Sequence, residues 1–330
     1  MAQAEGLNSR LTQKGGTDNA IFVNPAKLVY QNDNSKIKID FLKSSLSLSD
    51  DSFTFLKELK EATSSSDKNR EISELLKKNI GNPLSFSAYN FSSISQNKKA
   101  FSWSVGVADS IDGYFITHSG FGSKGAMESF IQKYKAVVTT FALKKENFSY
   151  GINLKSIKKT LSLHNYSIRE MIDNSSFSDY FESKNSKEES AIGVDAGLIY
   201  NLENPLFNPK FSLSFLDIGD TSFQDIGTLP STTNIGVSLT PYQDMFIQFD
   251  YLDIFKHQKN QKFEDAFRVY LSQNFFNKQL KLNTGLLQNA LSYGIEYNYS
   301  LINIALNSYK TKTYIQDKER KYELSIALSW

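Results

Sequence analysis

Large apolar and small or polar side chains alternate along the C-terminal third of the chain. From Tyr322 to Trp330 every second residue is large and apolar, and the residues between them are Glu, Ser and Ala. Segments 302–306, 293–299 and 280–286 repeat this pattern. Successive side chains of a β-strand point to opposite faces, so a period of two predicts strands with one apolar face and one polar face.

The same pattern continues toward the N-terminus and predicts about fourteen strands. Beyond the four segments just described, the predicted strands lie near 36–48, 84–95, 100–113, 134–144, 148–164, 192–200, 209–217, 235–239, 245–251 and 267–271. The connections between them alternate in length. Those after even-numbered strands, such as 96–99 and 145–147, are short, whereas those after several odd-numbered strands, such as 49–83 and 165–190, are long. Short periplasmic turns and longer extracellular loops are typical of outer-membrane barrels.

Composition favours a membrane barrel over a soluble protein. The 330 residues include 25 Phe and 17 Tyr, yet mean hydropathy is negative. No apolar run exceeds about five residues, whereas a transmembrane helix needs ~20. Barrel strands instead alternate a lipid-facing apolar side with a polar lumen side. A soluble β-sandwich would also alternate, but it would rarely place so much Gly and Asn opposite so many aromatics.

Residues 1–35 contain no predicted strand. Asp18 can cap a short helix that carries Ile21, Phe22 and Val23, and Pro25 interrupts or restarts it. Because the lumen of a barrel this wide is not filled by its strands' side chains alone, we expect this segment to fill it as a plug. The alternative is a helix against the periplasmic rim. Residues 36–330 would then form the barrel.

Two connections look helical. Residues 53–80, within a predicted extracellular insert at 50–82, place apolar side chains at i, i+3 and i+4, and residues 168–182 carry apolar side chains among polar ones. These helices would pack together as a lid or form an apolar entry groove. The candidate groove residues are Phe55, Leu59, Met171, Phe177 and Phe181.

No catalytic or metal site is predicted. Cysteine is absent, and His118, His164 and His257 are isolated from one another. Calcium at the Asp-rich loop 217–225 is an alternative to ordinary turn chemistry, but its spacing does not fit an EF-hand. The formal charge of +2, with 37 basic and 35 acidic residues interspersed, gives no basic block for nucleic acid. We therefore expect neither an enzyme nor a cofactor.

Alternation places several charged residues on the lumen side. Their expected role is to pair with one another and with the plug, because a charge in the lumen costs far less than one facing lipid. They are Asp195, Asp250, Lys281, Glu296 and Glu323.

Two stretches resemble a known family. The run from Gly15 to Leu28, which ends in Asn24-Pro25-Ala26-Lys27-Leu28, resembles the N-terminal hatch of FadL-type hydrophobic-compound transporters. Residues 292–330 resemble the last three strands of that superfamily, and the helical insert after the first strand resembles the plasmid-transfer TraF-like outer-membrane barrels. The resemblance implies a 14-stranded barrel, a hatch role for Asn24, Pro25, Ala26 and Leu28, and a C-terminal signal that the barrel-assembly machinery recognises. We assign that signal to Tyr322, Leu328 and Trp330.

These observations lead to one main functional hypothesis and two alternatives. We expect passive uptake of fatty acids or other apolar compounds by a monomer in the bacterial outer membrane, surrounded by outer-membrane lipid. A structural or interaction barrel, serving secretion, conjugation or surface attachment, is the alternative, and a diffusion porin is disfavoured by the hatch.

Ala2-Gln3-Ala4 has the form of a cleavage-site end, so we expect a signal peptide to have been removed; a natural start is the other interpretation.

Overall fold

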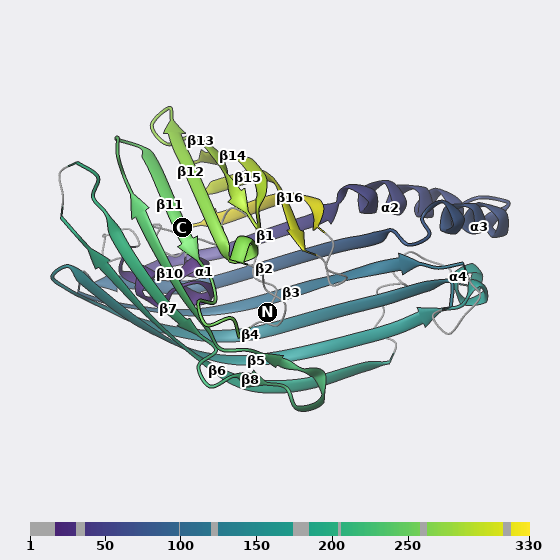
Figure 1. The fold of residues 1–330 in the computed structure, drawn as a ribbon, viewed down its shortest axis with the longest axis horizontal. Helices are drawn as coiled ribbons and strands as arrows, with labels where there is room; N and C mark the ends of the chain where they lie inside the picture. Colours follow the sequence, from purple (N-terminus) through teal and green to yellow (C-terminus); the bar gives the residue numbers. More distant parts are fainter. Residues whose placement is uncertain are drawn as a thin grey trace.

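Fourteen antiparallel strands close into one barrel (Figure 1). The computed structural model describes residues 17–30, 37–98, 100–119, 125–173, 185–203, 206–257, 263–312 and 318–330. The barrel strands are β1 (Ile37–Ser49), β2 (Pro83–Lys98), β3 (Phe101–Thr117), β4 (Met127–Lys145), β5 (Phe148–Tyr166), β6 (Ser186–Asn201), β7 (Lys210–Leu216), β10 (Thr232–Leu239), β11 (Met245–Tyr251), β12 (Phe267–Phe275), β13 (Leu280–Leu287), β14 (Ala290–Tyr299), β15 (Ile302–Lys312) and β16 (Lys318–Ser329). The predicted fold class and strand number are confirmed.

The barrel closes where the first strand meets the last. β1 pairs with β16, and Ile39 exchanges two backbone hydrogen bonds with Trp330, at 2.7 and 2.8 Å. Elsewhere each strand pairs with its sequence neighbours, and β7 pairs with β10 because the intervening β8 (Thr221–Ser222) and β9 (Thr228–Leu229) form a separate small sheet. The pairing of β1 with β16 therefore completes the ladder, and a closed ladder leaves no strand edge exposed.

The connections confirm the predicted short–long bias. Two residues join β4 to β5, and two join β14 to β15, whereas residues 50–82 separate β1 from β2. β3 and β4 are longer than predicted at the end next to the connection that joins them. β3 continues to Thr117 and β4 begins at Met127, and these two residues are register partners. Helices cover the outer face of this extension, so its side chains do not follow the alternation from which the strands were predicted.

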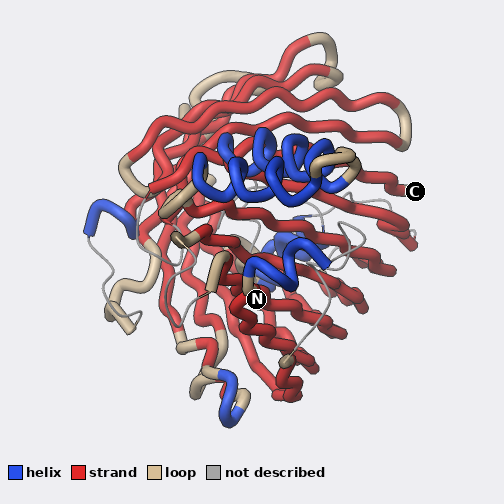
Figure 2. The backbone as a smooth tube through the Cα atoms, turned by 90° about the vertical axis from the view of Figure 1, so that its right-hand side faces the viewer, coloured by secondary structure: helices blue, strands red, loops and turns tan. Residues whose placement is uncertain are grey.

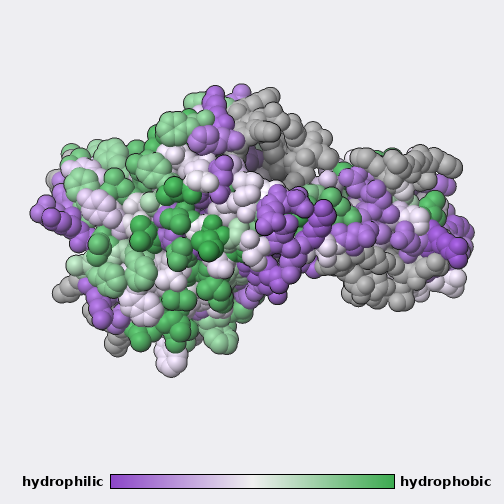
Figure 3. All heavy atoms as spheres, turned by 90° about the horizontal axis from the view of Figure 1, so that it is seen from below, coloured by the Kyte–Doolittle hydropathy of each residue, from purple (hydrophilic) through white to green (hydrophobic). Residues whose placement is uncertain are grey.

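The outward face changes from apolar to charged along the tall strands. On β5, Phe148, Tyr150, Ile152 and Leu154 are exposed, and the outward positions after them are Ser156 and Lys158. Lys158 makes an ion pair of 2.7 Å with Glu188 on β6. Figure 3 shows the apolar belt over the barrel and a hydrophilic band between it and the helical end. An apolar belt of limited height with charge beyond it is what a barrel in a bilayer requires.

Aromatic rings line the outer edge of this belt at the short-connection end. Phe101 stacks on Phe141, and Tyr200 lies between Phe148 and Phe211, with ring centroids 4.7 to 6.4 Å apart. Aromatic girdles of this kind mark the interfaces of transmembrane barrels. The girdle accounts for part of the Phe and Tyr content of the sequence.

The predicted insert forms a helical hairpin of α2 (Asp50–Thr63) and α3 (Lys68–Lys78), which extends past the strand ends (Figures 1 and 2). Ser49 caps α2 by accepting a hydrogen bond from the Ser52 backbone N–H. Apolar side chains of both helices pack with the loop ends of β2–β5; the shared cluster includes Phe55, Leu59, Ile72, Leu75, Leu76, Leu84, Phe86, Phe115, Ile131 and Tyr166. No helix in the described part of the chain is long and apolar enough to cross a membrane.

The hairpin covers the outer side of the wall. Phe86, which packs with the hairpin, lies an odd number of residues from Phe91, which packs with Ile21 of the N-terminal segment. Side chains at odd separations point to opposite faces of a strand. Within the described residues, the helical insert and the N-terminal segment therefore pack on opposite faces of the sheet.

Helix α4 (Ile168–Asp173) begins with a capping box after β5. The Glu170 carboxylate accepts from the Ser167 backbone N–H at 2.8 Å, and the Ser167 hydroxyl accepts from the Glu170 N–H at 3.2 Å. The backbone hydrogen bond from Ser167 lowers the pKa of Glu170, with smaller contributions from the Ser167 hydroxyl and His164. The cap therefore fixes where this long connection leaves the wall.

We expect Leu59→Ala to loosen the helical hairpin without opening the barrel. Leu59 is fully buried between the hairpin and β2, and deleting such a side chain costs about 2–5 kcal/mol. Limited proteolysis of folded protein should cut the segment between α2 and α3 faster, while heat-dependent gel mobility, which reports barrel closure, stays normal. Lys57→Ala on the exposed side of α2 is the control, and equal protection of both variants would contradict the packing role.

Candidate functional site: the lumen and the segment within it

The segment after residue 16 lies against the lumen side of β2–β7. It forms α1 (Thr17–Phe22) and the short helix η1 (Pro25–Tyr30), close to the predicted helix and its restart at Pro25. The hatch candidates Asn24, Pro25, Ala26 and Leu28 are all buried. Both helices contact the strands β3 and β4, and η1 also contacts β5 and β6.

Asn24 is the central polar anchor of this segment. Its side-chain N–H₂ donates to the Ser212 hydroxyl on β7 at 2.8 Å, and its side-chain oxygen accepts from the Ala26 backbone N–H at 3.0 Å. One amide thus ties the segment to the wall and organises the turn into η1. The Asn-Pro-Ala sequence therefore suits a tight turn that presses against a strand.

Two glycines in the wall make room for this turn. A Cβ atom added at Gly197 on β6 would overlap the Asn24 side-chain oxygen, and one at Gly151 on β5 would overlap the Pro25–Ala26 backbone. Glycine inside a strand commonly marks such a close approach of another backbone. The wall and the segment are therefore fitted to each other.

Side chains of the wall also bind the backbone of the segment at its two ends. Asn153 on β5 donates to the Ile21 carbonyl at 2.6 Å, and Asn97 on β2 donates to the Val29 carbonyl at 2.9 Å. These bonds satisfy helix-end carbonyls that would otherwise be buried without partners. The position of the segment is set by directional hydrogen bonds as well as by apolar burial.

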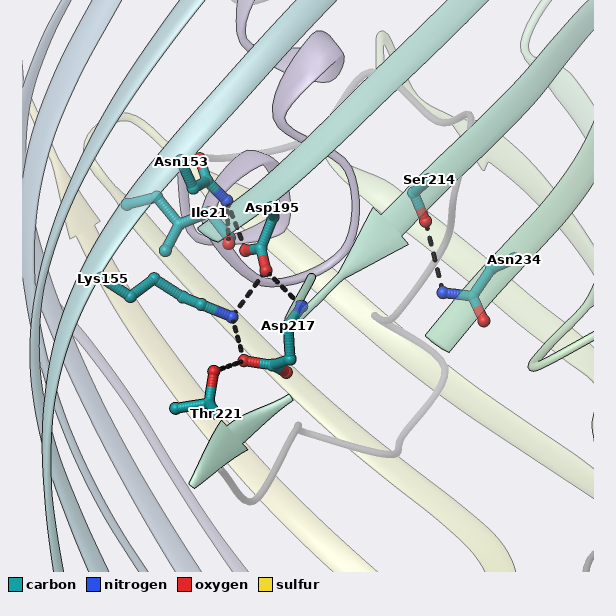
Figure 4. Close-up of polar contacts among 8 residues, drawn as sticks. All are labelled: Ile21, Asn153, Lys155, Asp195, Ser214, Asp217, Thr221 and Asn234. Carbon is teal, nitrogen blue, oxygen red and sulfur yellow. Dashed lines mark hydrogen bonds and ion pairs between the residues drawn. The ribbon is translucent and has the colours of Figure 1, made fainter. Parts of the chain in front are cut away.

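A buried ion network lies beside this anchor (Figure 4). Lys155 Nζ on β5 lies 2.6 Å from Asp195 Oδ1 on β6 and 2.7 Å from Asp217 Oδ1. Asp195 also accepts from the Asn153 side chain at 2.9 Å and from the Asp217 backbone N–H at 2.8 Å. Asn153 therefore connects the network to Ile21 and so to the N-terminal segment.

The network holds a loop that folds into the lumen between β7 and β10. Thr221 donates to Asp217 at 2.9 Å, and Lys159 Nζ donates to the Ile226 carbonyl of η3 (Gln224–Ile226) at 2.7 Å. Phe223, at the tip of this inward loop, is fully buried, and Lys159 lies 5.5 Å from its ring centroid. The loop is a second element within the lumen.

An aromatic and aliphatic cluster joins the N-terminal segment, the wall and the inward loop. Phe22 makes edge contacts with Tyr89 and Phe91 on β2, with ring centroids 6.1 and 6.0 Å apart. On the other side Phe223 contacts Tyr134 on β4, at 6.4 Å. This side of the lumen is therefore lined by an apolar cluster, in contrast to the polar interior of a general porin.

Among the other charges that alternation placed in the lumen, Lys281 and Glu296 confirm the predicted pairing, whereas Glu323 is bonded to a neutral amide. Lys281 and Glu296 oppose each other on β13 and β14 and form an ion pair of 2.7 Å. Glu323 is buried on β16 and accepts from the Asn307 side chain at 3.0 Å. The Asp217 carboxylate, considered for calcium, faces Lys155 instead.

The predicted entry-groove residues are only partly described. Phe55 and Leu59 are buried in the contact between the hairpin and the wall. Met171 belongs to α4, and Phe177 and Phe181 lie outside the described residues. The entry groove stays a prediction, as does the hatch assignment for residues 1–35.

The predicted C-terminal signal lies on the last strand. Tyr322 and Trp330 are exposed, and both share the outward parity of Leu328. Recognition of these residues by the assembly machinery stays a prediction.

Sequence reasoning did not find Asn153, Lys155 or the inward loop. The buried Phe223 and Ile226, in an otherwise polar connection, are a sequence signal for the inward loop.

Gly197→Val should displace the N-terminal segment from the wall. The new side chain would occupy the space of the Asn24 amide, so Lys27, now 1% exposed, should become accessible. We expect trypsin cleavage after Lys27 in the folded barrel to accelerate at least about tenfold, equivalent to ~1.4 kcal/mol of opening free energy. Ser190→Val, on the outward side of β6, is the control; equal cleavage in both variants would refute the fit.

Lys155→Met should destabilise the barrel strongly. Removing the cation leaves the carboxylates of the buried Asp195 and the partly buried Asp217 facing each other, and breaking a buried pair costs about 3–5 kcal/mol. Guanidinium unfolding in detergent, followed by fluorescence, should show a lower midpoint. Adding Asp195→Asn and Asp217→Asn to Lys155→Met should restore much of the stability; a triple variant as unstable as the single one would argue against the network.

Comparison with known proteins identifies the fold. No family model and no curated protein matches the chain in sequence. Among solved structures, the Ralstonia pickettii toluene transporter TbuX matches with a TM-score of 0.61 and 10% identity, over 98% of this chain and 96% of that one. A deletion mutant of the monoaromatic hydrocarbon channel TodX matches at 0.59 and 12%, over 98% and 97%. The Pseudomonas putida toluene transporter TodX matches at 0.57 and 10%, over 99% and 97%.

Identities this low establish the fold alone. None of these matches tests the TraF-like subgroup, which stays a prediction. The chain has the closed fourteen-strand barrel fold of FadL-type hydrophobic-compound transporters, over nearly its whole length.

Proposed function

We propose that this chain is a bacterial outer-membrane barrel that takes up apolar small molecules passively, with the segment at residues 1–35 acting as its hatch. The apolar belt, the aromatic girdle and the shared transporter fold support the outer-membrane location. The observation that carries the uptake proposal is the aromatic cluster in the lumen, where Phe22, Tyr89 and Phe91 meet.

The cluster supports an apolar class of ligand. On the side of the lumen next to β2–β5, Ile21, Phe22 and Phe223 form an apolar cluster with the wall. If the segment shifts, the surfaces that it uncovers are aromatic rings and aliphatic side chains of β2 and β4. Such surfaces bind apolar compounds, because burial of apolar area is favourable at about 25 cal/mol per Å². Fatty acids and small aromatic hydrocarbons are the ligands that we propose.

The connections of the segment suit a hatch that moves. Among the described residues, the hydrogen bonds that join it to the wall include those from Asn97 and Asn153 and the one to Ser212, beside its apolar contacts. Each such bond contributes only about 0.5–1.5 kcal/mol net, because water replaces the partner when the bond opens. A ligand that competes for the aromatic cluster can therefore bias the segment between a closed and an open position.

Phe91→Asn should weaken binding of toluene or palmitate by about tenfold, which corresponds to the ~1.4 kcal/mol expected for one buried ring contact. Native mass spectrometry in mild detergent would measure the retained ligand. Phe276→Asn, at an exposed position between β12 and β13, is the control. Deleting residues 1–30 should abolish retention and raise ion conductance.

Two results would reject uptake. One is wild-type protein that retains neither compound under any condition. The other is retention that survives both Phe91→Asn and the deletion. A barrel without ligand that co-purifies with a defined protein partner would instead favour the structural or interaction barrel.

A further inference from the structure

An apolar groove crosses the outer side of the barrel next to the start of α2. It has a volume of about 830 Å³, and its walls come from β1, β13–β16 and the first turn of α2. One row of the groove runs straight across the ladder, because consecutive register partners line it: Leu46, Leu324, Leu306, Ile295 and Leu282. Phe53 of α2 and Tyr293 of β14 complete the apolar surface.

This groove faces the lipid and not the lumen. Leu46, Leu306 and Leu324 are 51%, 55% and 45% exposed, whereas their neighbours Asn307 and Glu323, which also border the groove, are buried on the lumen side. The exposed side chains share the outward parity of the apolar belt. The groove is therefore separate from the hatch and the lumen cluster, and binding there does not depend on uptake through the lumen.

A cationic rim adjoins the groove on β15 and β16. Lys310 and Arg320 are direct register partners, and both have the outward parity of Leu306 and Leu324. Like charges directly opposite each other destabilise a strand pair. Within the described part of the chain, neither side chain makes an ion pair with an acidic residue. Two positions further along, Lys312 is the register partner of Lys318, so basic residues occupy both positions of two register pairs.

Arg320 is held in place at this rim. Its guanidinium donates to the Ser308 hydroxyl at 2.9 Å and to the Leu291 carbonyl at 3.3 Å, and it lies 5.6 Å from the Tyr293 ring centroid. A guanidinium oriented in this way keeps further donors for an anion, and Arg binds phosphate oxygens well. Two acidic residues among those described border the groove: Glu323, which is buried on the lumen side, and Asp50, whose charge is offset by the positive end of α2.

From this juxtaposition we propose that the groove and its rim bind a phosphorylated, acylated lipid of the outer leaflet, with an acyl chain in the groove and a phosphate at Lys310 and Arg320. The charge complementarity selects a phosphate-bearing lipid over a neutral apolar compound. The lipid would relieve the repulsion between the paired cations and cover the apolar surface next to α2.

The test uses the full-length protein in detergent and purified lipid A carrying two phosphates as the probe, with the enzymatically dephosphorylated lipid as its counterpart. Native mass spectrometry at increasing salt should show retention of the phosphorylated lipid and at least tenfold weaker retention of the other. The double variant Lys310→Gln, Arg320→Gln should lose the preference. Lys57→Gln, Lys77→Gln, which removes two exposed cations of the helical hairpin, should keep it.

Three outcomes would overturn the proposal. The two lipids could be retained equally by the wild type, as bulk boundary lipid would be. The preference could survive in the Lys310/Arg320 variant. Palmitate could displace lipid A from the wild type and stay bound to that variant, which would assign the groove to the transported compound. Heat-dependent gel mobility verifies that each variant is a closed barrel, so a folding defect cannot be mistaken for lost binding.

Discussion

The requirement that every backbone polar group find a partner within the bilayer governs this structure. In lipid, an unpaired N–H or C=O costs several kcal/mol, so a sheet that spans the membrane must close on itself. Here β1 closes the barrel by pairing with β16 along its length, and Ile39 and Trp330 exchange backbone hydrogen bonds at the end of this ladder. Closure of fourteen strands in turn creates a lumen wider than strand side chains can fill. The N-terminal segment and the inward loop fill part of that space.

Filling the lumen explains residue choices that the strands themselves do not require. Gly151 and Gly197 weaken their strands slightly, yet they permit the Asn24–Ala26 turn to lie directly on the wall. Lys155 is costly to bury, but it links β5, β6 and the inward loop through two carboxylates. Asn153 joins the same network to Ile21. Polar contacts thus define where each filling element sits, and apolar contacts stabilise it there.

Alternation of side chains allowed the barrel, its strand number and its connection lengths to be predicted from sequence, because a strand's period and its lipid face are local properties. It also assigned Asp195 and Glu323 to the lumen. It could not identify Lys155 as the partner of Asp195, because strand register across the ladder is not written in either strand alone. Nor could it show that loop 217–231 turns inward, since Asp217, Gly219 and Asp220 are ordinary turn residues. The helical hairpin was predicted, but its packing on the outer side was not, because it depends on the length of β2–β5 at their loop ends.

The outer and inner faces of the tall strands β2–β5 make different kinds of contact. Outside, Phe86 and Phe115 are apolar beyond the charged band because the helical hairpin covers them, so the extension is stabilised without lipid. Inside, Phe91 and Tyr134 belong to the cluster that contacts the N-terminal segment and the inward loop. Displacing Phe22 from Tyr89 and Phe91 exposes apolar area to water, and only a molecule of similar character can compensate for that cost. The outer packing therefore supports the wall from the side away from the lumen, and the proposed displacement of the N-terminal segment would change contacts on the inner side alone.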